Sequence, residues 1–273
     1  MHASLQGAVD RPARIRGKRL GGALGLATLL TTGFFCLFAV VLNQPQILFH
    51  YSVASGNIVL YADEPFPPEA GVRVLSAAQR RLALTPLYSE HGNYNVFICN
   101  SRWRRFIFFN KDYGVGGVAQ YPATPHVFLT AAAIDRNRIL SSRGTPVMDD
   151  RTLDYFIAHE IVHQVTGRKL GAVRWLMLPA WVREGYADYI ARGSSFDYAR
   201  ERQAFFADMP EMDVRKSGLY RRFQLLTTFL LDRRQWNLDE LLLHSPDELA
   251  VEDAVRYDST DSAPAGEDGD LLR

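Results

Sequence analysis

The chain has 273 residues, of which 47% are hydrophobic and 22% charged, and its formal net charge is +1. This composition excludes a collagenous, a disulfide-stapled and a wholly disordered protein, and we expect no nucleic-acid partner at so neutral a total charge. The total nevertheless conceals three different segments: residues 1–19 carry a net charge of +4, residues 43–246 also +4, and residues 247–273 carry −7.

The first predicted element is a membrane-spanning helix at residues 20–42. These 23 residues contain no charge, and as a helix they would extend over roughly 34 Å, enough to cross a hydrocarbon core about 30 Å thick. Residues 1–19 form a basic leader that is expected to stay in the cytoplasm, which places everything after residue 42 on the periplasmic or extracellular side. The alternatives are a cleaved secretory signal and a helix of a soluble protein.

Residues 43–246 form the predicted exported domain, which we expect to have an α+β fold. Four short apolar segments predict strands: 57–61, 95–99, 105–109 and 127–130. Pro67 and Pro68 open a helical pattern that would place Val72, Leu75, Gln79 and Leu82 on one face. From Asp149 onward the apolar period is helical. The sequence therefore predicts a small mixed β-sheet with one helix, followed by a mainly helical half.

Residues 247–273 form the last predicted segment, an acidic tail. Nine acidic residues stand there against Arg256 and Arg273. Such a composition buries too little apolar surface to become ordered, so we expect a solvated, disordered tail.

The first chemical motif is His-Glu-x-x-His within residues 149–167. Asp149 or Asp150 is expected to cap the start of this helix, and Gly167 to end it.

His159 and His163 stand one helical turn apart, so their imidazoles can converge on one point, with Glu160 beside it. This spacing is typical of zinc peptidases, in which the two histidines bind the metal and the glutamate is the general base. The alternative is a pair of ordinary histidines on a polar helix face.

A second predicted helix at residues 179–192 carries two carboxylates four residues apart, Glu184 and Asp188. A catalytic zinc commonly has two histidines and one glutamate as ligands, and a further carboxylate orients one of the histidines. Glu184 fits the third ligand and Asp188 the orienting carboxylate. The alternative for Glu184 is a solvated helix residue, although its apolar neighbours indicate burial.

The two motifs together resemble the gluzincin metallopeptidases, in particular the small peptidase MA-like domains related to thermolysin and the M1 aminopeptidases. The family pattern is His-Glu-x-x-His followed by a Trp-x-x-Glu-Gly-x-Ala helix, and this chain has HEIVH at 159–163 and WVREGYADY at 181–189. The resemblance covers residues 57–244 and implies a zincin-like fold with one Zn²⁺ per chain. It assigns roles to the zinc ligands His159, His163 and Glu184, the general base Glu160 and the supporting Asp188. Twenty residues separate the second histidine from the glutamate, slightly more than in the best-known members, so the intervening loop is expected to differ.

A weaker similarity extends to residues 218–226, which are similar to the M1 segment whose tyrosine stabilises the tetrahedral intermediate. It makes Tyr220 a candidate oxyanion donor, or else a tyrosine that anchors a helix in the core. The glycine-rich segment at 114–120 lacks the glutamate with which M1 enzymes bind a substrate amino terminus, so aminopeptidase activity is not expected. The strand at 126–130 is a candidate edge for pairing with an extended peptide. His126 is a weaker candidate ligand, more typical of a strand end.

These motifs predict a membrane-anchored zinc peptidase whose partners are a peptide or protein substrate and, through residues 20–42, the lipid bilayer. One alternative is a tethered, inactive domain that keeps zinc to bind peptides, although Glu160 has no purpose in a purely structural site. An intramembrane protease is disfavoured because charged residues flank the motif and no second long apolar run surrounds it. The substrate and the oligomeric state stay open.

Overall fold

The structure is a computed structural model that describes residues 13–109, 115–141 and 143–258. The chain divides into two compact units, Met1–Pro45 and Gln46–Arg273. In the first unit, α1 (Ala13–Asn43) contains the segment Gly25–Asn43, whose mean hydropathy is 2.2. By length and composition this helix can cross a membrane, a property that membrane anchors and signal sequences share.

The second unit is built on a five-stranded mixed sheet with the strand order β1-β2-β3-β5-β4. Its strands are β1 (Tyr51–Ser55), β2 (Ile58–Ala62), β3 (Tyr94–Ile98), β4 (Gly117–Ala119) and β5 (Val127–Leu129). β2, β3 and β5 run parallel, and the two outer strands pair antiparallel with them. The expected mixed sheet within an α+β architecture is therefore confirmed.

The edge of the sheet differs from the prediction. The segment at 126–130 was expected to offer a free edge, but β5 lies between β3 and β4, and the edge is β4. No strand was predicted for the glycine-rich segment at 114–120. In the structure its last glycine, Gly117, pairs with Leu129 and begins the strand.

Residues 105–109 form a helix instead of the expected strand. They belong to α3 (Arg102–Phe109), in which Phe108 and Phe109 are buried while Phe106 is exposed. The Phe108 ring stacks on Phe128 of the sheet with centroids 4.2 Å apart. A short apolar run does not distinguish a strand from a buried helical turn, which is the reason for the error.

The predicted helix after Pro67 is present as α2 (Pro68–Leu82), but its buried face is rotated from the expected one. Leu75 and Leu82 are buried as expected, whereas Val72 is 39% exposed and Val74 is buried. Gln79 is half-buried and donates to the carbonyl oxygen of Ser55 at 2.9 Å, which ties the helix to β1.

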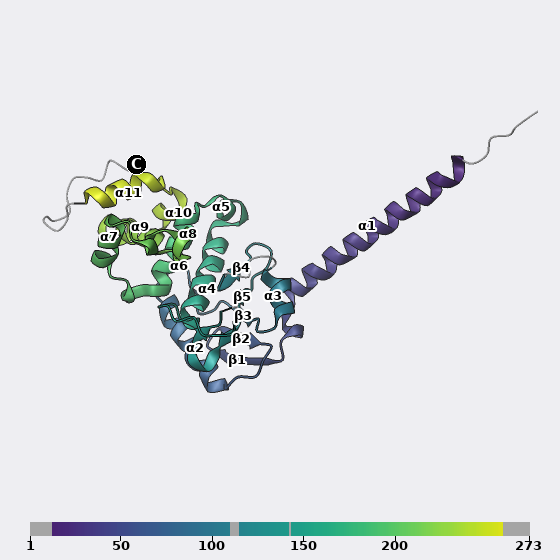
Figure 1. Cartoon of the computed structure of the whole chain (residues 1–273), viewed down its shortest axis with the longest axis horizontal. Helices are drawn as coiled ribbons and strands as arrows, with labels where there is room; N and C mark the ends of the chain where they lie inside the picture. The colour runs from purple at the N-terminus through teal and green to yellow at the C-terminus, as the bar shows by residue number, and fades with distance from the viewer. Residues whose placement is uncertain (1–12, 110–114, 142, 259–273) are drawn as a thin grey trace, which may run out of the picture. The chain divides into compact units, whose positions relative to one another are not determined.

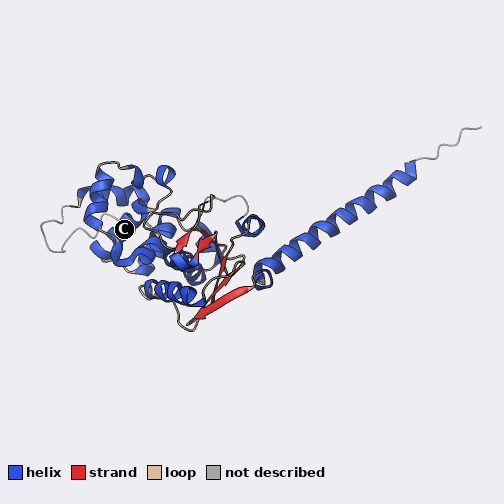
Figure 2. Ribbon diagram, turned by 60° about the horizontal axis from the view of Figure 1, so that its bottom comes forward, coloured by secondary structure: helices blue, strands red, loops and turns tan. Residues whose placement is uncertain are grey.

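The rest of the second unit is mainly helical, as predicted. A small two-stranded sheet, β6 (Ala132–Ala133) and β7 (Arg138–Ile139), precedes it. The helices are α4 (Leu153–Leu170), α5 (Ala172–Met177), α6 (Ala180–Arg192), α7 (Tyr198–Phe206), α8 (Val214–Ser217), α9 (Arg221–Thr228) with the π-helical segment Phe229–Arg233, α10 (Leu238–Leu243) and α11 (Glu248–Tyr257). Short 3-10 turns lie at Pro45–Leu48, Ile134–Arg136, Gly193–Ser195 and Pro210–Met212. α4 packs against β4 and β5 of the sheet, against α2 and against α6, and α6 packs in turn against α2 and α9 (Figures 1 and 2).

The acidic tail is ordered further than its composition indicates. Asp247 caps α11 by accepting hydrogen bonds from two backbone amides. Val251 and Val255, four residues apart, are both fully buried. The expectation of disorder from residue 247 is therefore wrong for Glu248–Tyr257, because a count of acids does not detect two valines at helical spacing. Residues 259–273 lie outside the described part of the chain.

Candidate metal centre

The helix α4 supplies both histidines of the motif from a buried position. All of its residues from Leu153 to Gly167 are buried. The helix begins after Thr152 and ends at Gly171, whose φ is 75°, so the expected caps at Asp149, Asp150 and Gly167 are wrong. Gly167 instead lies inside the helix, where a Cβ atom would come within 2.5 Å of the Tyr121 ring.

Three side chains from α4 and α6 converge on one point. His159 Nε2 and His163 Nε2 lie 3.1 Å apart, and Glu184 Oε2 lies 3.3 Å from each. Among the described residues, these three form a group whose ligand atoms are close enough to hold one metal ion. The structure thus brings together the three residues that the sequence singled out as candidate ligands.

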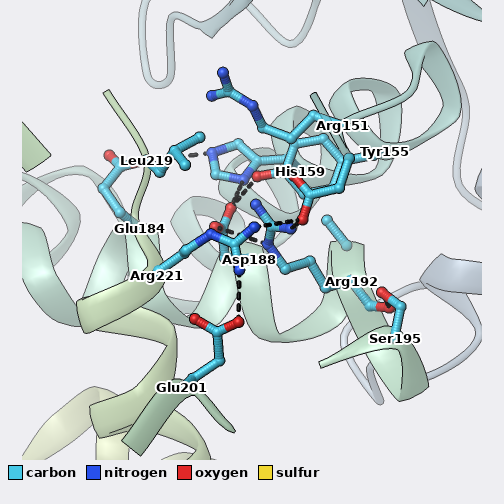
Figure 3. Close-up of polar contacts among 12 residues, drawn as sticks. Arg151, Tyr155, His159, Glu184, Asp188, Arg192, Ser195, Glu201, Leu219 and Arg221 are labelled. Carbon is cyan, nitrogen blue, oxygen red and sulfur yellow. Dashed lines mark hydrogen bonds and ion pairs between the residues drawn. The ribbon is translucent and has the colours of Figure 1, made fainter. Parts of the chain in front are cut away.

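Asp188 lies behind His159, where a carboxylate that orients a metal-bound histidine is expected. Its Oδ1 atom is 2.9 Å from His159 Nδ1, and it also accepts a hydrogen bond from the Tyr155 hydroxyl (Figure 3). Arg192, one turn further along α6, places its Nε 3.5 Å from Asp188 Oδ2. Because Asp188 accepts a hydrogen bond from the proton on Nδ1, the neutral form of the His159 ring presents the lone pair of Nε2 to the convergence point.

The second oxygen of Glu184 is held away from that point. Arg183 Nε lies 3.3 Å from Glu184 Oε1, and the Arg183 guanidinium is 5.5 Å from the centroid of the Trp175 ring. Trp175 in turn packs edge-on against His163 with centroids 5.6 Å apart. Arg183 and Trp175 therefore position Glu184 and His163 from the open side of the site.

The electrostatics of the cluster fit a cation. Burial lowers the pKa of His159, but hydrogen bonding to Asp188 and Glu184 outweighs it and raises that pKa to about 10. Burial would raise the pKa of Glu184, yet the charges and hydrogen bonds of His163 and His159 hold it well below its ordinary value. Buried carboxylates need a compensating positive charge, and two imidazoles with one carboxylate are the donors that Zn²⁺ accepts in catalytic sites. The residues present therefore fit a zinc ion.

Glu160 lies against the edge strand of the sheet. A Cβ atom on Gly117 would come within 2.8 Å of Glu160 Oε1, so only glycine leaves room for this carboxylate. Burial raises the pKa of Glu160, while His163, His159 and a hydrogen bond from the Ala119 backbone oppose the rise. A carboxylate with a raised pKa beside a cation site is suited to accept and return a proton.

Tyr220 also reaches the site, from the turn that begins α9. Its ring lies nearly parallel to that of His159, with centroids 6.1 Å apart and an interplanar angle of 11°. Burial and the negative charges of Glu184 and Glu160 raise its pKa, so the phenol keeps its proton and can donate a hydrogen bond.

A cleft of about 700 Å³ opens over these residues. The edge strand β4 forms one wall, and Trp175, Arg183 and Tyr220 line other parts of it. This volume lies within the range of sites that accept a small ligand or a few residues of a peptide.

A chain of ion pairs behind the site was not anticipated from the sequence. Asp150 accepts hydrogen bonds from Arg192 of α6 and from Arg221 of α9, the latter at 2.9 Å. Arg221 also pairs with Glu201 at 2.5 Å (Figure 3). Helical spacing could have indicated two residues of this region, since Tyr155 lies four residues before His159 and Arg192 four after Asp188. No local pattern indicates Asp150, because its partners are distant in sequence.

Other histidines do not join the cluster. His126 is buried at the sheet, where its ring meets Phe97 edge-on with centroids 5.4 Å apart. Within the described residues, neither His126 nor His91 nor His244 belongs to a group that could hold a metal.

Comparison with protein-family models, with curated proteins and with solved structures finds no match to this chain. Its function is therefore inferred from its motifs and from the geometry that the fold gives them.

Proposed function

We propose that this chain is a membrane-anchored zinc metallopeptidase with a zincin-like domain on the extracytoplasmic side. The observation that carries the proposal is the convergence of His159, His163 and Glu184, with Glu160 on the same wall of one cleft. A site that only held zinc for structural reasons would have no need of a buried carboxylate beside it.

When bound, zinc would supply Lewis-acid chemistry, polarising the scissile carbonyl and making a water molecule more acidic. Glu160 accepts the proton of the attacking water and delivers it to the leaving amine. The Tyr220 phenol donates a hydrogen bond to the oxygen on which negative charge develops. Asp188 and Arg183 keep His159 and Glu184 in place while this happens.

The test is hydrolysis of a mixed peptide library by the zinc-loaded full chain, with Glu160→Gln beside it. We expect both proteins to bind one zinc, and we expect Glu160→Gln to lose about 10²- to 10⁴-fold in hydrolysis, since general base catalysis contributes that much. Glu90→Gln, which changes an exposed glutamate of a loop, is the matched control and should keep full activity.

Two outcomes would overturn parts of this proposal. Full turnover by Glu160→Gln would exclude Glu160 as the base. Zinc binding without any hydrolysis by the unaltered chain would indicate a tethered domain that binds peptides or proteins through a zinc site instead of cleaving them.

A further inference from the structure

The helix α3 exposes aromatic and basic side chains together, away from the candidate metal centre. Trp103 and Phe106, three residues apart on one helical face, expose 47% and 65% of their surface. The exposed Arg102 and the half-buried Arg105 flank them, and among the described residues neither of these two guanidinium groups pairs with a carboxylate. The surface of a soluble protein rarely exposes two large aromatic rings beside unpaired cations, so this face is a candidate binding surface.

The backbone that enters the second unit runs against the same helix. Arg104 Nε donates to the carbonyl oxygen of Leu48 at 2.8 Å, and its guanidinium lies 4.2 Å from the centroid of the Trp103 ring. Ile47, the residue before Leu48, is 70% exposed. We call the following residues the entry surface: Ile47, Arg102, Trp103, Arg105 and Phe106.

Covalent geometry holds this surface near the end of the apolar helix. The apolar segment ends at Asn43, five residues before Leu48. A chain extends at most about 3.6 Å per residue, so Leu48 lies within roughly 18 Å of that end however the two units are arranged. If the apolar helix spans a bilayer, its end lies at the bilayer surface, and the entry surface is within reach of the lipid headgroups.

We propose that the entry surface docks onto the bilayer that holds the apolar helix, an inference that rests on the proposed membrane anchoring. Trp103 and Phe106 insert among the headgroups, where aromatic side chains are enriched in membrane proteins. Arg102 and Arg105 bind the phosphates of anionic lipids. The proposed partner is a lipid surface because Arg102 and Arg105 are both positively charged, and because the apolar helix keeps the domain close to a bilayer. The contact would hold the domain, and with it the cleft, in one orientation above the bilayer.

A fluorescent label on the full chain in lipid nanodiscs tests this contact. The label NBD is attached to Phe106→Cys in a Cys36→Ser background, where Cys99 is buried and does not react. The matched control carries the label at Leu249→Cys on α11, because Leu249 is 68% exposed and Phe106 is 65% exposed. Nanodiscs contain phosphatidylcholine with phosphatidylglycerol, and doxyl-labelled lipids quench any label at the headgroup level.

We expect about threefold more quenching at position 106 than at position 249, because only the former lies at the lipid interface. Replacing Arg102 and Arg105 by glutamine should bring the quenching at 106 close to the control value in the same nanodiscs. Equal quenching at both positions would overturn the proposal. The proposal would also be overturned if the cysteine introduced at position 106 were shielded from labelling in native membranes but not in nanodiscs without other membrane proteins. That result would point to a protein partner.

This experiment separates the inference from the proposals on which it rests. If alkaline carbonate extracts the chain from membranes, the anchoring itself fails and the docking fails with it. If the chain is retained but position 106 stays unquenched, only the docking fails. Neither readout depends on peptide hydrolysis.

Discussion

At the scale of single residues, the orientation of the His159 ring depends on Asp188, which is more deeply buried than His159 itself. Asp188 is fully buried and contacts the ring nitrogen of His159 that faces away from the convergence point. The Tyr155 hydroxyl and the Arg192 guanidinium stabilise the negative charge of Asp188. The orientation of a candidate ligand is thus set by Asp188 and Arg192, which do not line the cleft, and by Tyr155, which does.

Replacing Asp188 by asparagine should therefore weaken metal binding without removing a ligand. We expect the zinc affinity of Asp188→Asn to fall about 10- to 100-fold, the usual loss when the carboxylate behind a metal-bound histidine is removed. Competition with a chromophoric chelator measures the change. An affinity equal to that of the unaltered chain would contradict the role given to Asp188.

Asp154, at the start of α4, makes stability depend on pH. Burial would raise its pKa, but hydrogen bonds from Thr152, Arg81 and Asn137 lower it below the ordinary value. A carboxylate with a lowered pKa stabilises the folded state above its unfolded pKa of about 3.9, and this contribution is lost as the pH falls through the folded value.

Asp154→Asn should accordingly be destabilised by about 1–3 kcal/mol at pH 7, the cost of weakening a charged hydrogen-bonded group. The difference from the unaltered chain should shrink as the pH falls from about 4, where unfolded Asp154 takes up a proton, through the lower pKa of the folded state. Urea unfolding at both pH values measures this difference. Asp135→Asn, which alters a carboxylate whose side chain is 57% exposed, is the control and should change little at either pH. A difference that stays constant with pH would exclude Asp154 as the titrating group.

At the scale of elements, one carboxylate ties together the helices that build the site. Asp150 precedes α4 and binds Arg192 of α6 and Arg221 of α9. Tyr220 is the residue before Arg221, so the start of α9 and the position of the phenol depend on this bridge.

A double-mutant cycle between Asp150 and Tyr220 tests that dependence. Tyr220→Phe should lower kcat about 10- to 100-fold as an oxyanion donor is lost, and Asp150→Asn about 10-fold through displacement of the same phenol. In the Tyr220→Phe background, Asp150→Asn should cost less than about twofold, because the two changes act on one interaction. Both variants should keep one zinc per chain. Independent, additive effects would show that Asp150 serves only the stability of the fold.

The elements also show which parts of the fold could be predicted from the sequence alone. The two helices with the candidate ligands were predicted because residues four apart share a helix face, which depends on local geometry only. The α3 helix and the edge position of β4 were missed because each depends on packing against a distant part of the chain. The ordered α11 was missed because a count of acidic residues overlooks the helical spacing of Val251 and Val255. Spacing placed Glu184 and Asp188 on one helix face, and the usual ligand set of a catalytic zinc predicted that they lie near His159; neither gave a sign of Asp150.

At the scale of the whole molecule, charge is distributed according to location. The net charge of +1 hides a basic leader, an uncharged apolar helix and a second unit in which residues 46–246 carry +4 and residues 247–273 carry −7. In our proposal the leader sets the topology, the apolar helix anchors the chain, and the entry surface orients the unit that contains the cleft. The second unit holds every residue assigned a chemical role.

X-ray absorption on the zinc-loaded full chain tests the proposed metal centre most directly. We expect one zinc per chain, bound by two imidazole nitrogens at about 2.0–2.1 Å and one carboxylate oxygen at about 2.0–2.2 Å, with no sulfur ligand. His163→Ala should remove one of the two imidazoles from the spectrum or abolish binding. A spectrum without imidazole, or one unchanged in His163→Ala, would contradict the assignment of this site.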